Sequence, residues 1–120
     1  MKQQLKLKLG GKNRLFTFGI LFLGNALERV EFEDYNDMLL KVSKNPFKYA
    51  PILMYESLLN TYKKQNKEVD FTELDVVNWL DKDYEQGMAD MLEFVQVFLG
   101  TNENKAPIED GKQEDNSKKK

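Results

Sequence analysis

The first thirty residues constrain the fold of this chain more than any other segment. Leucine and lysine alternate from Leu5 to Leu9, a Gly-Gly-Lys-Asn break covers 10–13, and the alternation returns at 14–19 as RLFTFG. A period of two on both sides of a glycine break predicts a β-hairpin, because successive side chains of a strand point to opposite faces. The apolar spacing becomes helical in ILFLGNALERV at 20–30, so the hairpin is expected to lead directly into an amphipathic helix.

The rest of the apolar spacing predicts a mainly α-helical fold behind a small N-terminal hairpin at about 4–18. We expect one compact domain of four to five helices in residues 1–100, which is enough chain for a single hydrophobic core. Gly24 costs a helix about 1 kcal/mol relative to alanine, and we interpret it as a site of close packing against another backbone. The helices are expected at 20–30, within 32–45, from Pro51 to about Gln65 after a short turn at 46–50, from about Thr72, and from Tyr84 to Leu99.

Individual residues predict where these helices begin and end. Thr72, with Asp75 three residues later, forms a variant of the capping box that starts a helix. Pro51 disfavours helical backbone at the residue before it, which is why a break is expected there. Gly100 is a helix stop. The segment 101–120 that follows is charged and nearly free of apolar side chains, so it is predicted to be a disordered tail.

The chain has no histidine and no cysteine, which removes the commonest general base, the commonest metal ligand and every nucleophile–base pair built on them. We therefore expect that the chain is not an enzyme, that it has no catalytic residue, and that it binds no cofactor or metal. Asp81, Asp83 and Glu85 have the spacing that opens a calcium loop. The glycine and the final glutamate that such a loop needs each come one position late, at Gly87 and Glu93.

Charge is distributed unevenly along a chain whose net charge is −2. Residues 68–93 hold nine acids against one base, whereas residues 1–18 hold five bases and no acid: Lys2, Lys6, Lys8, Lys12 and Arg14. Such a molecule either meets partners of opposite charge at its two ends or simply presents two solvated faces. Nucleic-acid binding is not expected, because the net charge is negative and the leucines of the basic segment need burial.

The same N-terminal segment has a second interpretation, since a basic front followed by an apolar stretch up to Ala26 is also typical of a signal peptide. Two observations favour a folded segment: the front alternates as a strand does, and the helical pattern continues through Glu28 and Arg29. No apolar run reaches the roughly 20 residues of a membrane span. We expect a cytoplasmic protein with no membrane contact.

The last predicted helix is hydrophobic on nearly all sides, because seven of the nine residues from Met91 to Leu99 are apolar. A helix of this kind is either buried in the core or carries a face for a partner or for weak self-association. We predict partner contacts at the junction of hairpin and first helix and on this last helix. The predicted partner-binding residues are Phe16, Phe18, Ile20, Met91, Phe94, Val97 and Phe98.

The segment Phe16-Thr17-Phe18-Gly19, followed by an amphipathic helix from Ile20 to Leu27-Glu28, resembles the tail assembly chaperones of long-tailed bacteriophages and prophages. The resemblance implies a non-enzymatic helper in the host cytoplasm that binds the tape-measure protein and recruits tail-tube subunits during tail morphogenesis. The alternative from the sequence is a regulatory protein–protein interaction domain of a mobile element, similar to an anti-repressor.

Overall fold

The N-terminal hairpin consists of β1 (Gln4–Leu9) and β2 (Lys12–Thr17), which pair antiparallel from Leu9↔Lys12 to Gln4↔Thr17. The computed structural model describes residues 4–100. Gly10 and Gly11 form the turn, with φ angles of 63° and 80°. Two consecutive positive φ angles match the right-handed twist of the strands, and glycine adopts them without a Cβ penalty. The turn is therefore tighter than the four-residue break in the sequence, and Lys12 and Asn13 belong to β2.

Five helices follow the hairpin within the described residues, so the predicted fold class is confirmed. The first and last helices have the predicted bounds, and the predicted disordered tail at 101–120 lies outside the described residues. The helices are α1 (Ile20–Val30), α2 (Tyr35–Lys44), α3 (Pro46–Lys64), α4 (Glu73–Lys82) and α5 (Tyr84–Leu99).

Helix α3 is one helix of 19 residues, and the predicted break at Pro51 is wrong. Proline at this position removes the hydrogen bond that its own N–H would donate to the carbonyl of Phe47, four residues earlier. Phe47 lies in the first turn of α3 and is 46% exposed, so the loss falls at a surface end of the helix. Ala50, the residue before the proline, is completely buried, and we infer that this packing holds it in helical geometry.

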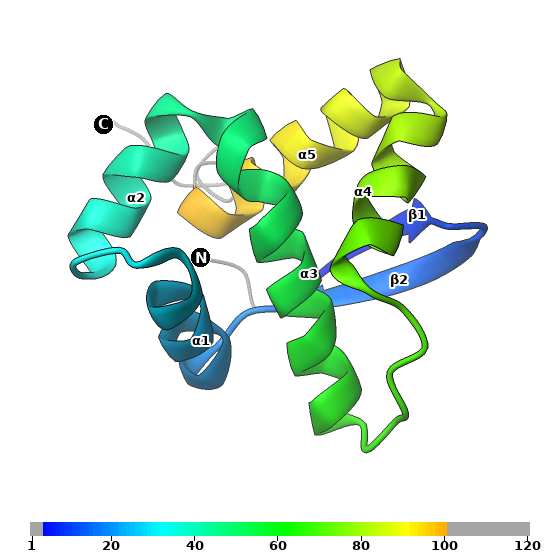
Figure 1. Cartoon of the computed structure of the whole chain (residues 1–120), viewed down its shortest axis with the longest axis horizontal. Coiled ribbons are helices and arrows are strands. Elements are labelled where there is room, and N and C mark those ends of the chain that lie inside the picture. The colour runs from blue at the N-terminus through cyan, green and yellow to red at the C-terminus, as the bar shows by residue number, and fades with distance from the viewer. Residues whose placement is uncertain (1–3, 101–120) are drawn as a thin grey trace, which may run out of the picture.

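Helix α3 runs through the middle of the molecule and contacts β2 and all four other helices (Figure 1). In this view α1 and α2 lie to one side of α3, and α4 and the hairpin lie to the other. The capping box of Thr72 and Asp75 starts α4 as predicted. At the α4–α5 corner a Cβ on Gly87 would overlap the backbone carbonyl of Leu80, so this close crossing requires glycine.

The core is centred on five phenylalanine rings contributed by β2, the residue after it, α1 and α5. The Phe18 ring centroid lies 5.4 Å from that of Phe22 and 5.3 Å from that of Phe94. Most of these pairs meet edge-on or tilted, which is the arrangement that aromatic quadrupoles favour. The cluster consists of Phe16, Phe18, Phe22, Phe94 and Phe98. It joins the hairpin to α5, two elements that lie near opposite ends of the described sequence.

Candidate functional site

Five of the seven residues predicted to contact a partner are core residues. Phe16, Phe18, Phe94, Val97 and Phe98 are at most 2% exposed. The prediction that these five lie on a surface is wrong, because the hairpin and α3 cover the apolar side of α5. The helix that is hydrophobic on most sides is thus enclosed by its own chain, which is the first of the two interpretations above.

The two remaining predicted residues differ from each other. Met91 is half-buried and packs against the core, whereas Ile20 is 90% exposed at the first turn of α1. Leu21 beside it is 50% exposed. Gly24 lies one turn further along the same side of α1, and no other element within residues 4–100 has an atom within 4 Å of where its Cβ would be. The predicted close packing of Gly24 against another backbone is therefore not found within residues 4–100, and α1 has an open apolar face. We call Ile20, Leu21 and Gly24 the α1 face.

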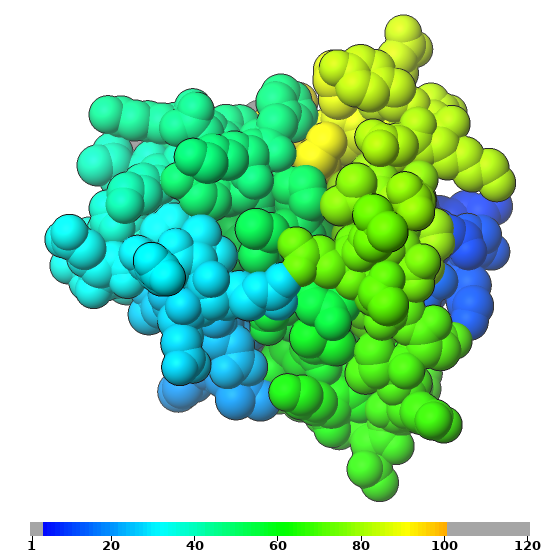
Figure 2. Space-filling view, in the orientation of Figure 1, coloured from blue at the N-terminus to red at the C-terminus, as the bar shows by residue number. Residues whose placement is uncertain are grey.

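Other exposed apolar side chains are scattered over several elements. Figure 2 shows the side of the molecule formed by α2, α3 and α4, with the hairpin at one edge. Single exposed apolar residues are normal on a protein surface, and none of these flanks an open glycine on its helix. They are Tyr35, Leu40, Phe47, Val69, Leu74, Tyr84 and Leu92.

An ion-pair network fixes α1 to the rest of the domain. The Arg29 guanidinium donates to Glu56 of α3 at 2.6 Å and also pairs with Glu73 of α4, while its carbon lies 5.5 Å from the Tyr55 ring centroid. A hollow of about 390 Å³ lies between α1 and α3, and Arg29, Glu56 and Leu59 are among the residues that line it. The α1 face is thus presented by a helix whose opposite side is held in place.

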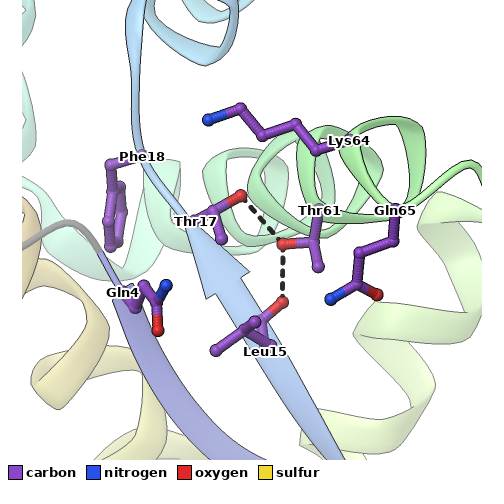
Figure 3. A pocket seen from close by; sticks show the side chains of 7 residues that line it. All are labelled: Gln4, Leu15, Thr17, Phe18, Thr61, Lys64 and Gln65. Carbon is purple, nitrogen blue, oxygen red and sulfur yellow. Dashed lines mark hydrogen bonds between the residues drawn. The ribbon is translucent and has the colours of Figure 1, made fainter.

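A buried polar network joins the end of the hairpin to α3. The Ser57 hydroxyl donates to the Thr17 carbonyl at 2.9 Å, and the Asn60 side-chain amide donates to the Thr17 hydroxyl at 2.7 Å. The Thr61 hydroxyl lies 2.7 Å from the Leu15 carbonyl and 2.9 Å from the Thr17 hydroxyl, as drawn in Figure 3. These bonds satisfy carbonyls on the outer edge of β2, which would otherwise be buried without partners.

The hollow beside this network measures about 290 Å³ and offers hydroxyls, amides and the Lys64 ammonium (Figure 3). Among residues 4–100, no carboxylate is hydrogen-bonded to the Thr17 or Thr61 hydroxyl. A hydroxyl becomes a nucleophile when an adjacent base takes its proton, and this arrangement provides none. The network is structural, and the Oδ1 atom of Asn60 is buried in it with no hydrogen-bond partner among the described residues.

The basic N-terminal segment is not a single solvated face. Lys6, Lys8 and Lys12 are exposed, but Arg14 is only 5% exposed, and its guanidinium lies over the aromatic rings of Trp79 and Phe71. Sequence reasoning counted Arg14 with the surface charges. One sequence signal distinguishes Arg14 from the exposed lysines: in an alternating strand it lies on the same side as Phe16 and Phe18.

Within residues 4–100 no three His, Cys, Asp or Glu side chains are grouped closely enough to hold a metal ion. In the same range, every helix is too short or too polar to cross a bilayer. Comparison with protein-family models, curated proteins and solved structures finds no match for this chain. Across residues 4–100 the geometry defines a small helical domain with an N-terminal hairpin, a closed phenylalanine core and an open apolar face on α1.

Proposed function

We propose that this chain is a non-enzymatic phage tail assembly chaperone, and that the α1 face binds the tape-measure protein and supports recruitment of tail-tube subunits. The α1 face carries this proposal, because it combines a 90% exposed Ile20 with an open Gly24 on the same side of one helix. It directly follows the Phe-Thr-Phe-Gly segment that resembles these chaperones.

The physical argument starts from the cost of this face to the isolated domain. An exposed glycine inside a helix destabilises it by about 1 kcal/mol relative to alanine. No other element of the described chain comes within 4 Å of the place where the Gly24 side chain is missing. A second helix can approach most closely where a side chain is absent. The flanking Ile20 and Leu21 then provide apolar area for a partner to bury, and burying one such side chain contributes about 1.5–3 kcal/mol.

The buried phenylalanines have a supporting role in this proposal. Phe18 lies next to Gly19 and packs against Phe22, one turn from the start of α1. This contact fixes the direction in which α1 leaves the hairpin. The Phe-Thr-Phe-Gly segment is then a positioning element for the α1 face, with its rings inside the core and the partner surface on the next helix.

Co-expression with the tape-measure and tail-tube proteins, whose genes the proposal expects beside this one, tests the proposal. We expect the wild-type chain to raise the soluble amount of the tape-measure protein and to co-purify with it. Ile20→Glu should reduce the co-purified amount about ten-fold or more, because a charged group replaces a buried side chain worth at least 1.4 kcal/mol. An acidic residue in the first turn of a helix is favourable, so the variant should fold.

Leu74→Glu is the matched control, because Leu74 is also apolar, 66% exposed and in the first turn of a helix. It should leave co-purification unchanged. Gly24→Ala provides a second variant that should raise the thermal stability of the isolated chain and still weaken binding. Equal behaviour of Ile20→Glu and Leu74→Glu, or no gain in tape-measure solubility with the wild-type chain, would contradict the proposal.

A further inference from the structure

A second hollow, about 440 Å³ in volume, lies where the hairpin turn meets the α4–α5 corner. Its walls include Gly10 of the turn, the Trp79 side chain and Gly87 of α5. Both glycines are places where the backbone of one element approaches another element closely. The volume lies within the range of sites that bind small groups, about 300–1,000 Å³. We call this hollow the turn pocket.

The turn pocket is lined by a carboxylate that lacks a counter-charge. Asp90 in α5 is only 7% exposed. Its hydrogen bond within residues 4–100 is to the Gln86 side-chain amide, at 2.9 Å from Oδ1, and no cation of that range forms an ion pair with it. Burial of a charged group is costly unless the group is paired. Within the described range, the fold therefore leaves this buried carboxylate without a paired cation.

We propose that the turn pocket binds an organic cation, either a lysine ammonium or an arginine guanidinium carried by a partner chain, with Asp90 as its counter-ion. The carboxylate pairs with the cationic head, and the Trp79 wall packs against the alkyl stem, which is how long basic side chains are usually accommodated. This site lies on a different element from the α1 face, and the proposal does not depend on the tail-chaperone function.

The charged residues at the rim do not supply the missing cation. Lys8 and Lys82 line the turn pocket and are exposed, and neither forms an ion pair in the described part of the chain. Asp83 also lines it, and its carboxylate accepts a hydrogen bond from the Gln86 backbone as the N-cap of α5. The rim thus carries two lysines against one aspartate. Recognition of a cation therefore depends on the buried Asp90 and not on the net charge of the pocket.

Trp79 is the single tryptophan of the chain, so its fluorescence reports directly on occupancy of the turn pocket. The probes are n-butylammonium for lysine, Nα-acetyl-arginine amide for arginine, and Nα-acetyl-citrulline amide as the neutral isostere of the latter. We expect a saturable fluorescence change with at least one charged probe. If the arginine probe binds, the citrulline probe should bind the pocket at least about ten-fold more weakly. The charged probe that saturates identifies which side chain the pocket takes.

Asp90→Asn should weaken binding of the charged probe about ten-fold or more, because the amide keeps the shape but not the charge. Asp81→Asn is the control, since Asp81 is an exposed acid that does not line the pocket. The contrast between arginine and citrulline probes is measured on the wild-type chain, so the test does not depend on the fold of a variant. Absence of saturation with both charged probes, equal affinity of the arginine and citrulline probes, or an equal loss in Asp81→Asn would overturn the proposal.

Discussion

The guanidinium carbon of Arg14 lies 4.0 Å from the centroid of the Trp79 ring. The Arg14 Nε–H also donates to the Leu9 carbonyl at 2.9 Å, and Nη1 donates to the Tyr62 hydroxyl at 3.3 Å. No carboxylate of residues 4–100 pairs with this buried cation. Aromatic faces and neutral oxygens therefore replace the counter-ion, and they fasten the hairpin to α4 and to the end of α3.

Arg14→Lys should lower the free energy of unfolding by about 2 kcal/mol, because an ammonium is more strongly hydrated than a guanidinium and cannot stack as a plane. Arg29→Lys is the matched control. Arg29 is 36% exposed at its side chain and pairs with two carboxylates. A lysine there keeps counter-ions and access to water, so the loss should be about half of that in Arg14→Lys or less. Urea unfolding of both variants measures the difference, and equal losses would contradict the role assigned to the Trp79 stack.

The two turn glycines allow a direct separation of backbone strain from steric overlap. Both have positive φ, but a Cβ on Gly10 would lie 2.5 Å from the Trp79 ring, whereas a Cβ on Gly11 would meet no described residue within 4 Å. Gly11→Ala should cost about 1–2 kcal/mol from its left-handed backbone alone. Gly10→Ala should cost a further 1–3 kcal/mol or so from overpacking, because Arg14 limits the movement of the ring. Chemical denaturation of the two variants tests this order.

The buried network at the end of the hairpin should be sensitive to loss of one hydroxyl. Thr61→Val keeps the shape of the side chain but removes the partner of the Leu15 carbonyl, and it should cost about 1–3 kcal/mol in unfolding free energy. Ser43→Ala removes an exposed hydroxyl that donates to the Leu40 carbonyl at 2.9 Å, and it should stay within about 0.5 kcal/mol. A Thr61→Val variant as stable as Ser43→Ala would show that the network does not anchor the hairpin.

The start of α2 should lose stability in acid through Asp37. The backbone N–H of Glu33, which donates to its carboxylate at 2.9 Å, and then the Lys41 ammonium at 3.1 Å lower the pKa of Asp37. A carboxyl whose pKa is lower in the folded state stabilises the fold above its unfolded pKa, and this stabilisation disappears as the pH falls through the folded pKa.

Carboxyl NMR titration of Lys41→Met tests the order of these causes. The pKa of Asp37 should rise in the variant but remain below its ordinary value, because the Glu33 N–H still donates to the carboxylate. Complete return to the ordinary value would mean that the ammonium alone lowers it. The same titration of the wild-type chain at high salt should show a partial rise, since salt screens an exposed pair.

Much of the secondary structure could be predicted because its signals are local. Alternation from Leu5 and the paired glycines gave the hairpin, and the side chains of Thr72 and Asp75 satisfy backbone groups within their own turn. Pro51 shows the limit of such signals. Its effect on the preceding backbone is a local preference, and the packing of the completely buried Ala50 overrides it.

The candidate site was less predictable, because exposure is not a local property. Phe94 and Ile20 are both large apolar residues at helical spacing, yet one is fully buried and the other 90% exposed. Gly24 was expected to pack against another backbone, yet in the described part of the chain the space beside it is open. Arg14 is buried because two aromatic residues far along the chain come to lie against it.

The sequence alone determined the order of the elements, their type and most of their ends, because these depend on residues within a few positions of one another. The tertiary structure decided which apolar side chains form the core, which helix face stays open, and where Arg14 and Asp90 are buried. These outcomes depend on contacts between distant segments, such as that of Phe16 with Phe94. Whether such segments meet depends on the packing of the whole chain. The spacing of apolar residues within either segment does not reveal it.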